Sequence, residues 1–247
     1  MDCFENKTYV VIGASSGIGG TLSKMLLEKG AETWLVSRSK DNIINLLAVF
    51  PNAHFLQCDL LVSDDIERLG AFFLSNDVKL DGLVFCAGVS PLMKIEDTDV
   101  NVLKDSFQTN VISFIEIMKW FALEAISKTG SSVVVMSSIA ANIASFRQTV
   151  YASTKAALEE AVRCISKELI DRRIRINAIA AGAVNTPMLT KLMEQSDTLR
   201  TKLEKLYPLG LISPEQISNQ ILYLLSDFGA NTTGTVINLD SGFLSYK

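Results

Sequence analysis

The chain alternates short runs of apolar, often β-branched residues with longer segments whose apolar residues recur at helical spacing. The short runs are typical of strands, and several are apolar at every position, as expected when helices cover both faces of a sheet. The expected strands are Thr8–Ile12, Thr33–Val36, His54–Leu56, Leu83–Cys86, Ser132–Met136, Ile174–Ala178 and Thr235–Leu239. The expected helices are Gly19–Lys29, Asp41–Val49, Asp64–Ser75, Val102–Ser127, Val150–Asp171 and Pro214–Ser226.

This alternation predicts right-handed βαβ units and therefore a parallel sheet. No Pro/Gly/Ser-rich linker, internal repeat or low-complexity tract interrupts the pattern across the 247 residues. We therefore expect one α/β domain over residues 1–247, with a doubly wound, Rossmann-type parallel sheet of about seven strands and helices on both faces. The least regular stretch, residues 186–211, contains Pro187 and Pro208 and is expected to be a mobile substrate-binding segment.

Composition excludes several classes of protein. Hydrophobic residues make up 48% of the chain and charged residues 20%, which is too apolar for a disordered chain. The net charge of −4 gives no basic excess to neutralise a nucleic-acid backbone. No run of about 18 uncharged apolar residues predicts a membrane span, and the N-terminus lacks the pattern of a signal peptide. We therefore expect a cytoplasmic protein that binds neither nucleic acid nor membrane.

No metal site or disulfide framework is expected. The chain has one histidine and four scattered cysteines without CxxC spacing, which fits reduced thiols in the cytosol. His54 flanks a strand away from every motif, so a structural or surface role is expected. Cys164 falls within the apolar pattern of a helix and is expected in the core. The acidic pair Glu159-Glu160 is expected on a solvated helix face.

A glycine-rich turn follows the first expected strand and opens the first expected helix. Glycine lacks Cβ, so the backbone can turn tightly and bring its N–H groups close to a pyrophosphate, while the helix N-terminus adds partial positive charge. The segment reads Gly13-Ala14-Ser15-Ser16-Gly17-Ile18-Gly19, a GxxxGxG spacing rather than the commoner GxGxxG. Its position favours dinucleotide binding over a purely structural turn.

The end of the second expected strand bears on the choice of dinucleotide. It reads Val36-Ser37-Arg38. NAD-preferring sites usually have a carboxylate here for the adenosine ribose, whereas Ser37 provides none and Arg38 offers a guanidinium suited to a 2′-phosphate. The alternative is a solvated loop arginine. We expect NADP(H) to be preferred over NAD(H).

Tyr151 and Lys155 lie four residues apart in an expected helix, and therefore on one face. An ammonium beside a phenol favours the phenolate and should lower a pKa that starts at about 10, making Tyr151 a proton donor and acceptor. The pair alone could also be a simple helix surface. Ser137-Ser138 ends the fifth strand, at the edge where parallel sheets bind ligands. Asn110 lies in an apolar stretch, either at a helix kink or on the surface.

With these motifs, the chain resembles the short-chain dehydrogenase/reductase family over essentially its whole length, and within it most resembles the 3-oxoacyl-[acyl-carrier-protein] reductases. The resemblance is carried by Gly13–Gly19, Cys86-Ala87-Gly88, Asn110, Ser138, Tyr151-x-x-x-Lys155 and Asp240-Ser241-Gly242. It implies an enzyme that transfers a hydride between a nicotinamide and a carbonyl or secondary alcohol. A 3-oxoacyl thioester or related ketone is the implied substrate, which an acyl carrier protein could carry.

The resemblance also implies a role for each site residue. Tyr151 would protonate the carbonyl oxygen, and Ser138 would orient it. Lys155 would hold the nicotinamide ribose and lower the Tyr151 pKa, while Asn110 would position a water that links Lys155 to solvent. The implied cofactor contacts are Gly13, Ser15, Ser16, Gly17, Ile18, Gly19, Ser37, Arg38, Asp59, Leu60, Cys86, Ala87, Gly88, Tyr151, Lys155, Gly182, Val184 and Thr186.

Four residues depart from the family pattern but leave the catalytic set intact. They are Ile12, Cys86, Ala181 and Ser241, which replace the usual threonine, asparagine, proline and glycine. The Tyr-x6-Lys spacing of the related enoyl reductases is absent, so carbonyl chemistry is preferred over C=C reduction.

The family also implies a homotetramer built on two of the long helices. Phe114, Ile117, Phe121 and Leu158 would supply its apolar area, or would instead belong to the core of the chain itself. Lys128, Arg172 and Arg173 could form a basic patch for an acidic carrier protein, or be ordinary solvated charges.

Two alternative functions stay open. One is an NAD-linked sugar or polyol dehydrogenase, which a comparison of NADPH with NADH would separate from the first. The other is a catalytically idle Rossmann protein that binds nucleotide as a sensor or scaffold. Degenerate members should lose the tyrosine or the lysine, and this chain keeps both.

Overall fold

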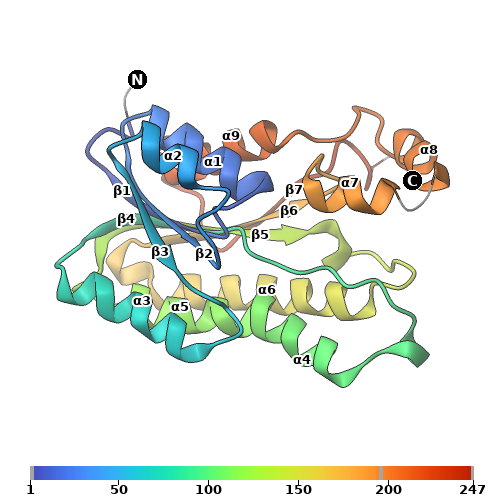
Figure 1. The fold of residues 1–247 in the computed structure, drawn as a ribbon, viewed down its shortest axis with the longest axis horizontal. Coiled ribbons are helices and arrows are strands. Elements are labelled where there is room, and N and C mark those ends of the chain that lie inside the picture. Colours follow the sequence, from blue (N-terminus) through green and yellow to red (C-terminus); the bar gives the residue numbers. More distant parts are fainter. Residues whose placement is uncertain (1–2, 195–196, 246–247) are drawn as a thin grey trace.

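The computed structural model describes residues 3–194 and 197–245, and within them seven parallel strands form one sheet in the order β3-β2-β1-β4-β5-β6-β7. The strands are β1 (Thr8–Ile12), β2 (Glu32–Ser37), β3 (Ala53–Gln57), β4 (Leu80–Phe85), β5 (Ser127–Ser138), β6 (Arg175–Ala181) and β7 (Val236–Leu239). Helices α1 (Gly17–Glu28), α2 (Ile44–Val49) and α9 (Pro214–Leu225) lie on one face of the sheet (Figure 1). The opposite face carries α3 (Ser63–Ser75), α4 (Val100–Phe107), α5 (Ser113–Phe121) and α6 (Thr149–Glu168). The predicted doubly wound α/β fold is confirmed.

The strand order reverses between β1 and β4, which are neighbours in the centre of the sheet. Connections from these two strands leave toward opposite sides, and a crevice forms outside their carboxyl ends, where open α/β sheets bind ligands. The glycine turn follows β1 and Cys86 follows β4, so the topology brings both segments to this crevice.

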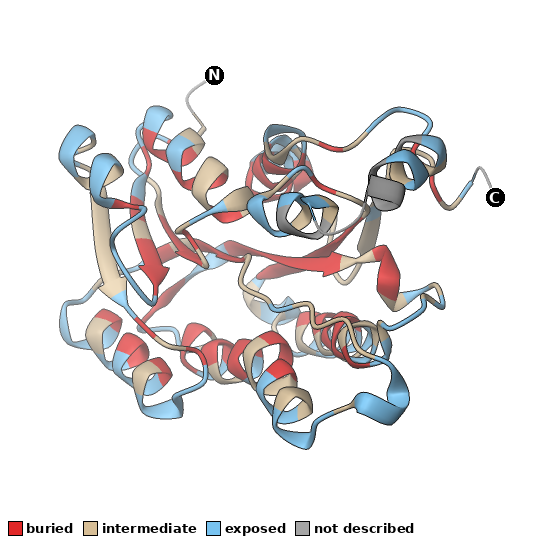
Figure 2. Cartoon of the chain, turned by 45° about the vertical axis from the view of Figure 1, so that its right-hand side comes forward, coloured by how far each residue is buried: buried red, intermediate tan, exposed pale blue. Residues whose placement is uncertain are grey.

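Burial explains why the central strands are apolar at every position. Val133 and Val135 of β5 belong to the core beneath α5 and α6, whereas Val134 and Met136 belong to the core beneath α1 and α9. Figure 2 shows the buried residues concentrated along the central strands and on the helix faces turned toward them. Each central strand therefore contributes to two hydrophobic cores.

The helix predicted over Val102–Ser127 is present from Val100 to Phe121, but it contains a wider turn and ends six residues earlier than predicted. α4 ends at Phe107, one wider π-type turn covers Gln108–Ile112, and α5 ends at Phe121. The Arg172 guanidinium donates to the backbone oxygens of Ala122 at 2.6 Å and Ser127 at 2.5 Å, so it satisfies carbonyls where the helix stops. Ser127 instead begins β5, opposite Leu80 of β4.

Residues 186–211, for which no helix was predicted, contain two helices. α7 (Pro187–Glu194) and α8 (Asp197–Leu206) occupy most of this stretch, and they lie at the end of the molecule toward which the β5 arrow points (Figure 1). Pro187 is the first residue of α7, where a missing N–H costs no hydrogen bond. Residues 195–196 lie outside the described residues. The mobility of the segment remains a prediction.

Several side chains lie elsewhere than the sequence suggested. Phe114, Ile117, Phe121 and Leu158 are fully buried in the chain's own core, so they cannot supply an interface with other copies. Cys164 is exposed rather than in the core. The four cysteines are free thiols. None of the helices in the described part of the chain is long and apolar enough to cross a membrane.

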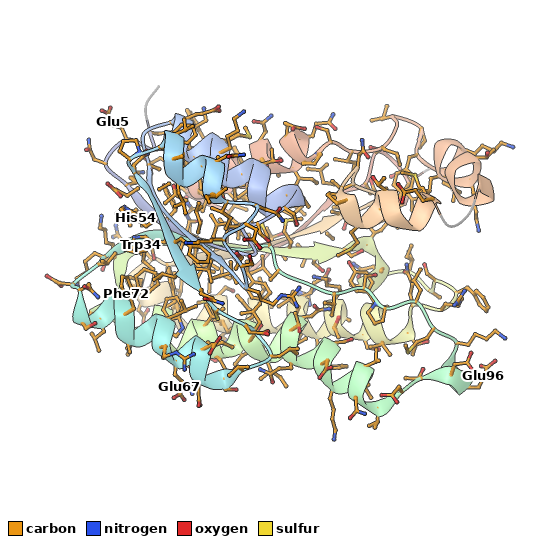
Figure 3. The ribbon with its side chains drawn as sticks, in the orientation of Figure 1. Glu5, Trp34, His54, Glu67, Phe72 and Glu96 are labelled. Atoms are coloured by element: carbon orange, nitrogen blue, oxygen red, sulfur yellow. The ribbon has the colours of Figure 1, made fainter. Side chains whose placement is uncertain are left out.

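His54 has a structural role at the edge of the sheet, as predicted. It lies in β3, stacks on Trp34 of β2 with ring centroids 4.5 Å apart, and pairs with Glu32. Phe72 of α3 contacts the same indole edge-on, with centroids 5.0 Å apart. Figure 3 shows these rings together where α3 meets the outer strands.

The packing of α3 against α5 yields a stability prediction. A Cβ at Gly70 would lie 2.7 Å from Cβ and Cγ of the buried Trp120. We expect Gly70→Ala to destabilise the fold by about 1–3 kcal/mol because the core cannot accept the added methyl group. Urea denaturation checks this. Gly20→Ala, in a helix position whose nearest Cβ contact would be an ordinary 3.4 Å, is the control. Equal stability of the two variants would contradict the prediction.

Candidate active site

The glycine turn between β1 and α1 is tightly built. Gly13 and Gly17 have φ angles of +85° and +54°, in the region that favours glycine. The backbone N–H groups of Gly13 and Ala14 donate to the Val36 carbonyl at 2.9 and 3.1 Å, which ties the turn to the end of β2. A Cβ at Gly19 would lie 2.2 Å from the Gly13 carbonyl oxygen. The backbone thus follows a path that side chains at these positions would prevent.

The first turn of α1 has the features of an anion site. In this described part of the chain, Ser16 precedes the helix but makes no side-chain cap hydrogen bond, and the first turn contains no acidic residue. The first backbone N–H groups of α1 therefore donate neither to a capping hydroxyl nor to a carboxylate of the first turn and are available to an anion. Thr186, which follows β6, lies against Gly17, where a Cβ would be 3.3 Å from its methyl group. This cradle fits a pyrophosphate.

The residues expected at the adenosine end line the ends of β2 and β3. Ser37 is buried and its hydroxyl donates to the Ser39 carbonyl at 2.6 Å. Arg38 is exposed. Asp59 is half-buried and accepts from the Leu61 N–H at 3.1 Å. Leu60 is buried. These positions are near one another because the Cys58 N–H donates to the Ser37 carbonyl.

The segment after β4 lies beside the glycine turn. A Cβ at Gly13 would be 2.7 Å from the Ala87 backbone nitrogen, so the two loops are in close contact. Burial raises the pKa of the Cys86 thiol to about 12, so this side chain stays protonated and is a poor nucleophile. A Cβ at Gly88 would lie 3.3 Å from Asn110 Oδ1 and 3.4 Å from Lys155 Nζ.

Asn110 is fully buried in the wider turn between α4 and α5, so the surface alternative is wrong and the kink is confirmed. Its Oδ1 accepts from the Val89 N–H at 2.8 Å, and its Nδ2 donates to the Val89 carbonyl and to Thr154 Oγ1, both at 2.9 Å. The amide therefore links the loop after β4 to α6. Single turns of this kind are frequent at functional sites.

Ser138, Tyr151 and Lys155 meet where β5 ends against α6. Lys155 Nζ donates to the Met136 carbonyl at 2.7 Å and lies 5.8 Å from the centroid of the Tyr151 ring. Burial raises the pKa of Tyr151, and a hydrogen bond with the Ser138 side chain opposes this rise. Lowering of the Tyr151 pKa by Lys155, which the sequence predicts, is therefore not the dominant effect. Burial also lowers the pKa of Lys155, to about 8.

Glu159 is a residue of this region that the sequence analysis misplaced. Its side chain is 3% exposed rather than solvated, and the Ser137 hydroxyl donates to its Oε1 at 2.7 Å. The signal was in the helical position: Glu159 lies one turn after Lys155, on the buried face that also carries Leu158.

The remaining expected contacts lie on the loop after β6. The Gly182 N–H donates to the Leu239 carbonyl at 2.9 Å, and a Cβ at Gly182 would lie 2.7 Å from the ring of Tyr207. Val184 is buried, and Thr186 Oγ1 donates to its carbonyl at 3.3 Å. This loop passes from the sheet edge to the first turn of α1.

An open hollow of about 350 Å³ lies over the loop after β5 and the neighbouring part of α6. Its wall is made of small and mostly apolar side chains from the loop after β5 and from α6. The lining residues are Ala140, Ala141, Asn142, Ile143, Ala144, Ala152, Ser153 and Ala156. Among the described residues, no cluster of three or more His, Cys, Asp or Glu side chains could hold a metal ion.

This arrangement is that of a short-chain dehydrogenase/reductase, and comparison with known proteins agrees. A family model described as enoyl-(acyl carrier protein) reductase matches residues 13–244, and the chain belongs to this family. It is therefore a short-chain dehydrogenase/reductase, an oxidoreductase of a family that uses nicotinamide cofactors.

Individual relatives differ in their substrates. L-xylulose reductase of Mus musculus is 30% identical over 238 residues, covering 96% of each chain. The 3-oxoacyl-[acyl-carrier-protein] reductase of Thermotoga maritima is 29% identical over 250 residues, covering 97% of this chain and 98% of that protein. A solved structure described as 4-hydroxyisoleucine dehydrogenase complexed with NADH superposes with a TM-score of 0.90 at 25% identity, covering 98% of this chain and 100% of that chain.

The buried amide of Asn110 gives a second prediction. We expect Asn110→Leu to cost about 1–3 kcal/mol of stability because the Val89 backbone and the Thr154 hydroxyl lose their partner. Hydrogen exchange at the Val89 amide should also become faster. Asn101→Leu, at an exposed position of α4, is the matched control. If both variants unfolded at the same denaturant concentration, Asn110 would not be stabilising the contact between the loop after β4 and α6.

Proposed function

We propose that the protein is an NADP(H)-dependent reductase that transfers a hydride to the carbonyl carbon of a ketone or 3-oxoacyl thioester, and catalyses the reverse oxidation of the alcohol. The observation that carries the proposal is the convergence of Ser138, Tyr151 and Lys155 at the sheet edge, with Asn110 behind them and the glycine turn beside them. The Tyr151-x-x-x-Lys155 spacing supports carbonyl rather than C=C reduction.

Each side chain has a defined task in this reaction. The reduced nicotinamide supplies the hydride when bound. Tyr151 donates its phenolic proton to the carbonyl oxygen, on which negative charge develops, and Ser138 donates a hydrogen bond to the same oxygen. The Lys155 ammonium binds the nicotinamide ribose and stabilises the phenolate that remains on Tyr151. Asn110 holds the loop after β4 in place and positions a water that returns a proton through Lys155.

The pKa directions suit reduction near neutral pH. Burial raises the pKa of Tyr151, so the phenol is protonated and able to donate. Burial lowers the pKa of Lys155 to about 8, so its ammonium form predominates at neutral pH and is lost above that value. Reduction should therefore decline on the alkaline side.

The side chains of the hollow over the loop after β5 support an apolar substrate. Five alanines and one isoleucine line it, so an acyl chain can bury surface there, while Asn142 and Ser153 are the partners that the hydroxyls of a sugar would have. A sugar or polyol substrate is the alternative, and the relationship to L-xylulose reductase is the reason to test it.

Two of the three basic residues expected to bind an acyl carrier protein are paired within the chain, and Arg173 is exposed. Lys128 pairs with Asp81 at 2.7 Å, and Arg172 is bound to two backbone carbonyls. Lys128 lies near the start of β5, at the opposite end of the strand from Ser138. A carrier-bound substrate therefore remains a proposal that rests on the 3-oxoacyl relative.

Cofactor choice, location and assembly complete the proposal. The lack of a carboxylate at Ser37 and the exposed guanidinium of Arg38 support NADP(H). Free thiols support a reducing, cytoplasmic setting. A homotetramer is proposed from family membership, and its apolar contacts would come from exposed side chains such as Ile112, Ile115 and Leu123.

Removal of the phenolic hydroxyl tests the proposed chemistry. We expect Tyr151→Phe to lower kcat for ketone reduction by about 100-fold or more, because the carbonyl oxygen loses its proton donor, while cofactor affinity changes little. Steady-state kinetics with a panel of apolar ketones and sugars measures this. Tyr223→Phe, on the exposed side of α9, is the control. Near-native reduction by the Tyr151 variant would refute the mechanism. A wild-type protein that binds nucleotide but reduces none of these compounds would favour the alternative of a catalytically idle nucleotide-binding protein.

Arg38→Ala tests the cofactor assignment. We expect the wild type to have a higher kcat/KM with NADPH than with NADH, and the variant to lose about tenfold of that preference because a charged hydrogen bond to the 2′-phosphate disappears. The variant should use NADH as well as the wild type does. An unchanged preference for NADPH would contradict the role of Arg38, and a wild-type preference for NADH would contradict the assignment of NADP(H).

A further inference from the structure

Glu159 is a buried acid that the proposed proton transfer does not use. Its side chain is 3% exposed, whereas that of the next residue, Glu160, is 66% exposed. Its partners are the Ser137 hydroxyl at 2.7 Å and the half-exposed Arg163, whose Nη2 lies 3.8 Å from Oε2. Burying a carboxylate costs free energy unless it is paired and hydrogen-bonded, so buried carboxylates are uncommon. The position therefore suggests a task beyond packing.

Glu159 belongs to an interlocked contact between β5 and α6. The last three residues of β5 each interact with one residue of α6, two of them through hydrogen bonds of 2.7 Å, and the three helix residues are spaced one turn apart. The Met136 carbonyl accepts from Lys155 Nζ, and the Ser137 hydroxyl donates to Glu159. The Ser138 side chain interacts with Tyr151 and lowers the pKa of its phenol. Glu159 is thus the third anchor between the strand end and the helix that carry the proposed catalytic groups.

Glu159 also provides a negative charge that stabilises the ammonium form of Lys155. Burial lowers the pKa of Lys155, while Cys86 and Glu159 oppose that change. The Cys86 thiol is neutral at physiological pH because burial raises its pKa to about 12. Tyr151 is neutral as well, since burial raises its pKa.

The other groups around this contact do not replace that charge. Asn110, Ser137 and Ser138 carry no charge, and Arg163 is a cation on the outer side of Glu159. Among the described groups around this contact, the Glu159 carboxylate is therefore the anion that favours the charged form of Lys155.

We propose that Glu159 is a positioning residue that keeps Lys155 protonated and holds α6 against the end of β5, and thereby sets the upper pH limit of cofactor binding. This inference rests on the proposed function, in which the Lys155 ammonium binds the nicotinamide ribose. Glu159 acts through Lys155 and touches neither substrate nor cofactor.

The test is the pH dependence of nucleotide binding by Glu159→Gln, which keeps the side-chain shape and removes the charge. Binding is followed by the fluorescence of NADPH or NADH, whichever the wild type binds more tightly. We expect the alkaline limit of binding to move to lower pH by about one unit, equivalent to about tenfold weaker binding on the alkaline side. Glu160→Gln removes the same charge from the exposed neighbour and should leave the limit unchanged.

A second variant covers the case in which Glu159→Gln does not fold. Ser137→Ala/Glu159→Leu replaces both partners of the buried hydrogen bond with apolar groups, which is often nearly neutral for stability. In this double variant, the alkaline limit of nucleotide binding should move to lower pH by the same amount. A limit that stays at the wild-type pH in a folded variant would overturn the proposal and leave Glu159 a purely structural residue. Because binding does not require turnover, an absence of ketone reduction would count against the proposed function without deciding this comparison.

Discussion

The covering of both faces of a parallel sheet is the constraint on which the rest of this structure depends. Parallel strands need helical crossovers, and the crossovers return every loop that follows a strand to the same edge. At that edge the glycine turn after β1, the loop after β4, the end of β5 and the loop after β6 come together. The site is thus assembled from segments that are far apart in sequence.

Burial at this edge determines the chemistry of the site. Few of its polar groups reach bulk water, so each is held by a specific partner: Asn110 by Val89 and Thr154, Lys155 by Met136, and Glu159 by Ser137. Burial also favours the neutral forms of Tyr151 and Lys155. Carbonyl reduction requires the protonated phenol of Tyr151, but it also requires the charged ammonium form of Lys155, which burial disfavours. The charge of Glu159 offsets the second effect.

Sequence periodicity was sufficient for the sheet but not for the helix ends. All seven predicted runs overlap the observed strands, and the central strands are apolar throughout because helices cover both of their faces. The helix predicted over Val102–Ser127 was too long, because its end depends on Arg172, about fifty residues further on. Such a contact leaves no local signal.

The candidate site was found by its motifs, and its buried network was found only in the structure. The glycine turn and the Tyr151/Lys155 pair have spacings that a sequence displays directly. The environment of Asn110 and Glu159 depends on which helix face meets the sheet, and a wider turn at Gln108–Ile112 shifts that face for Asn110. Glu159 lies on the same helix face as Leu158 and Lys155, but because it is charged we predicted that it would be exposed to solvent.

The most direct test of the central claim is to follow the transferred hydride itself. The wild-type protein is mixed with NADPH deuterated at the transferred position and an apolar ketone, and the product is examined by mass spectrometry and NMR. The account predicts that deuterium appears on the carbinol carbon of the alcohol. Deuterium that stays in a tightly bound nucleotide, with no alcohol formed from any ketone or sugar tested, would contradict it.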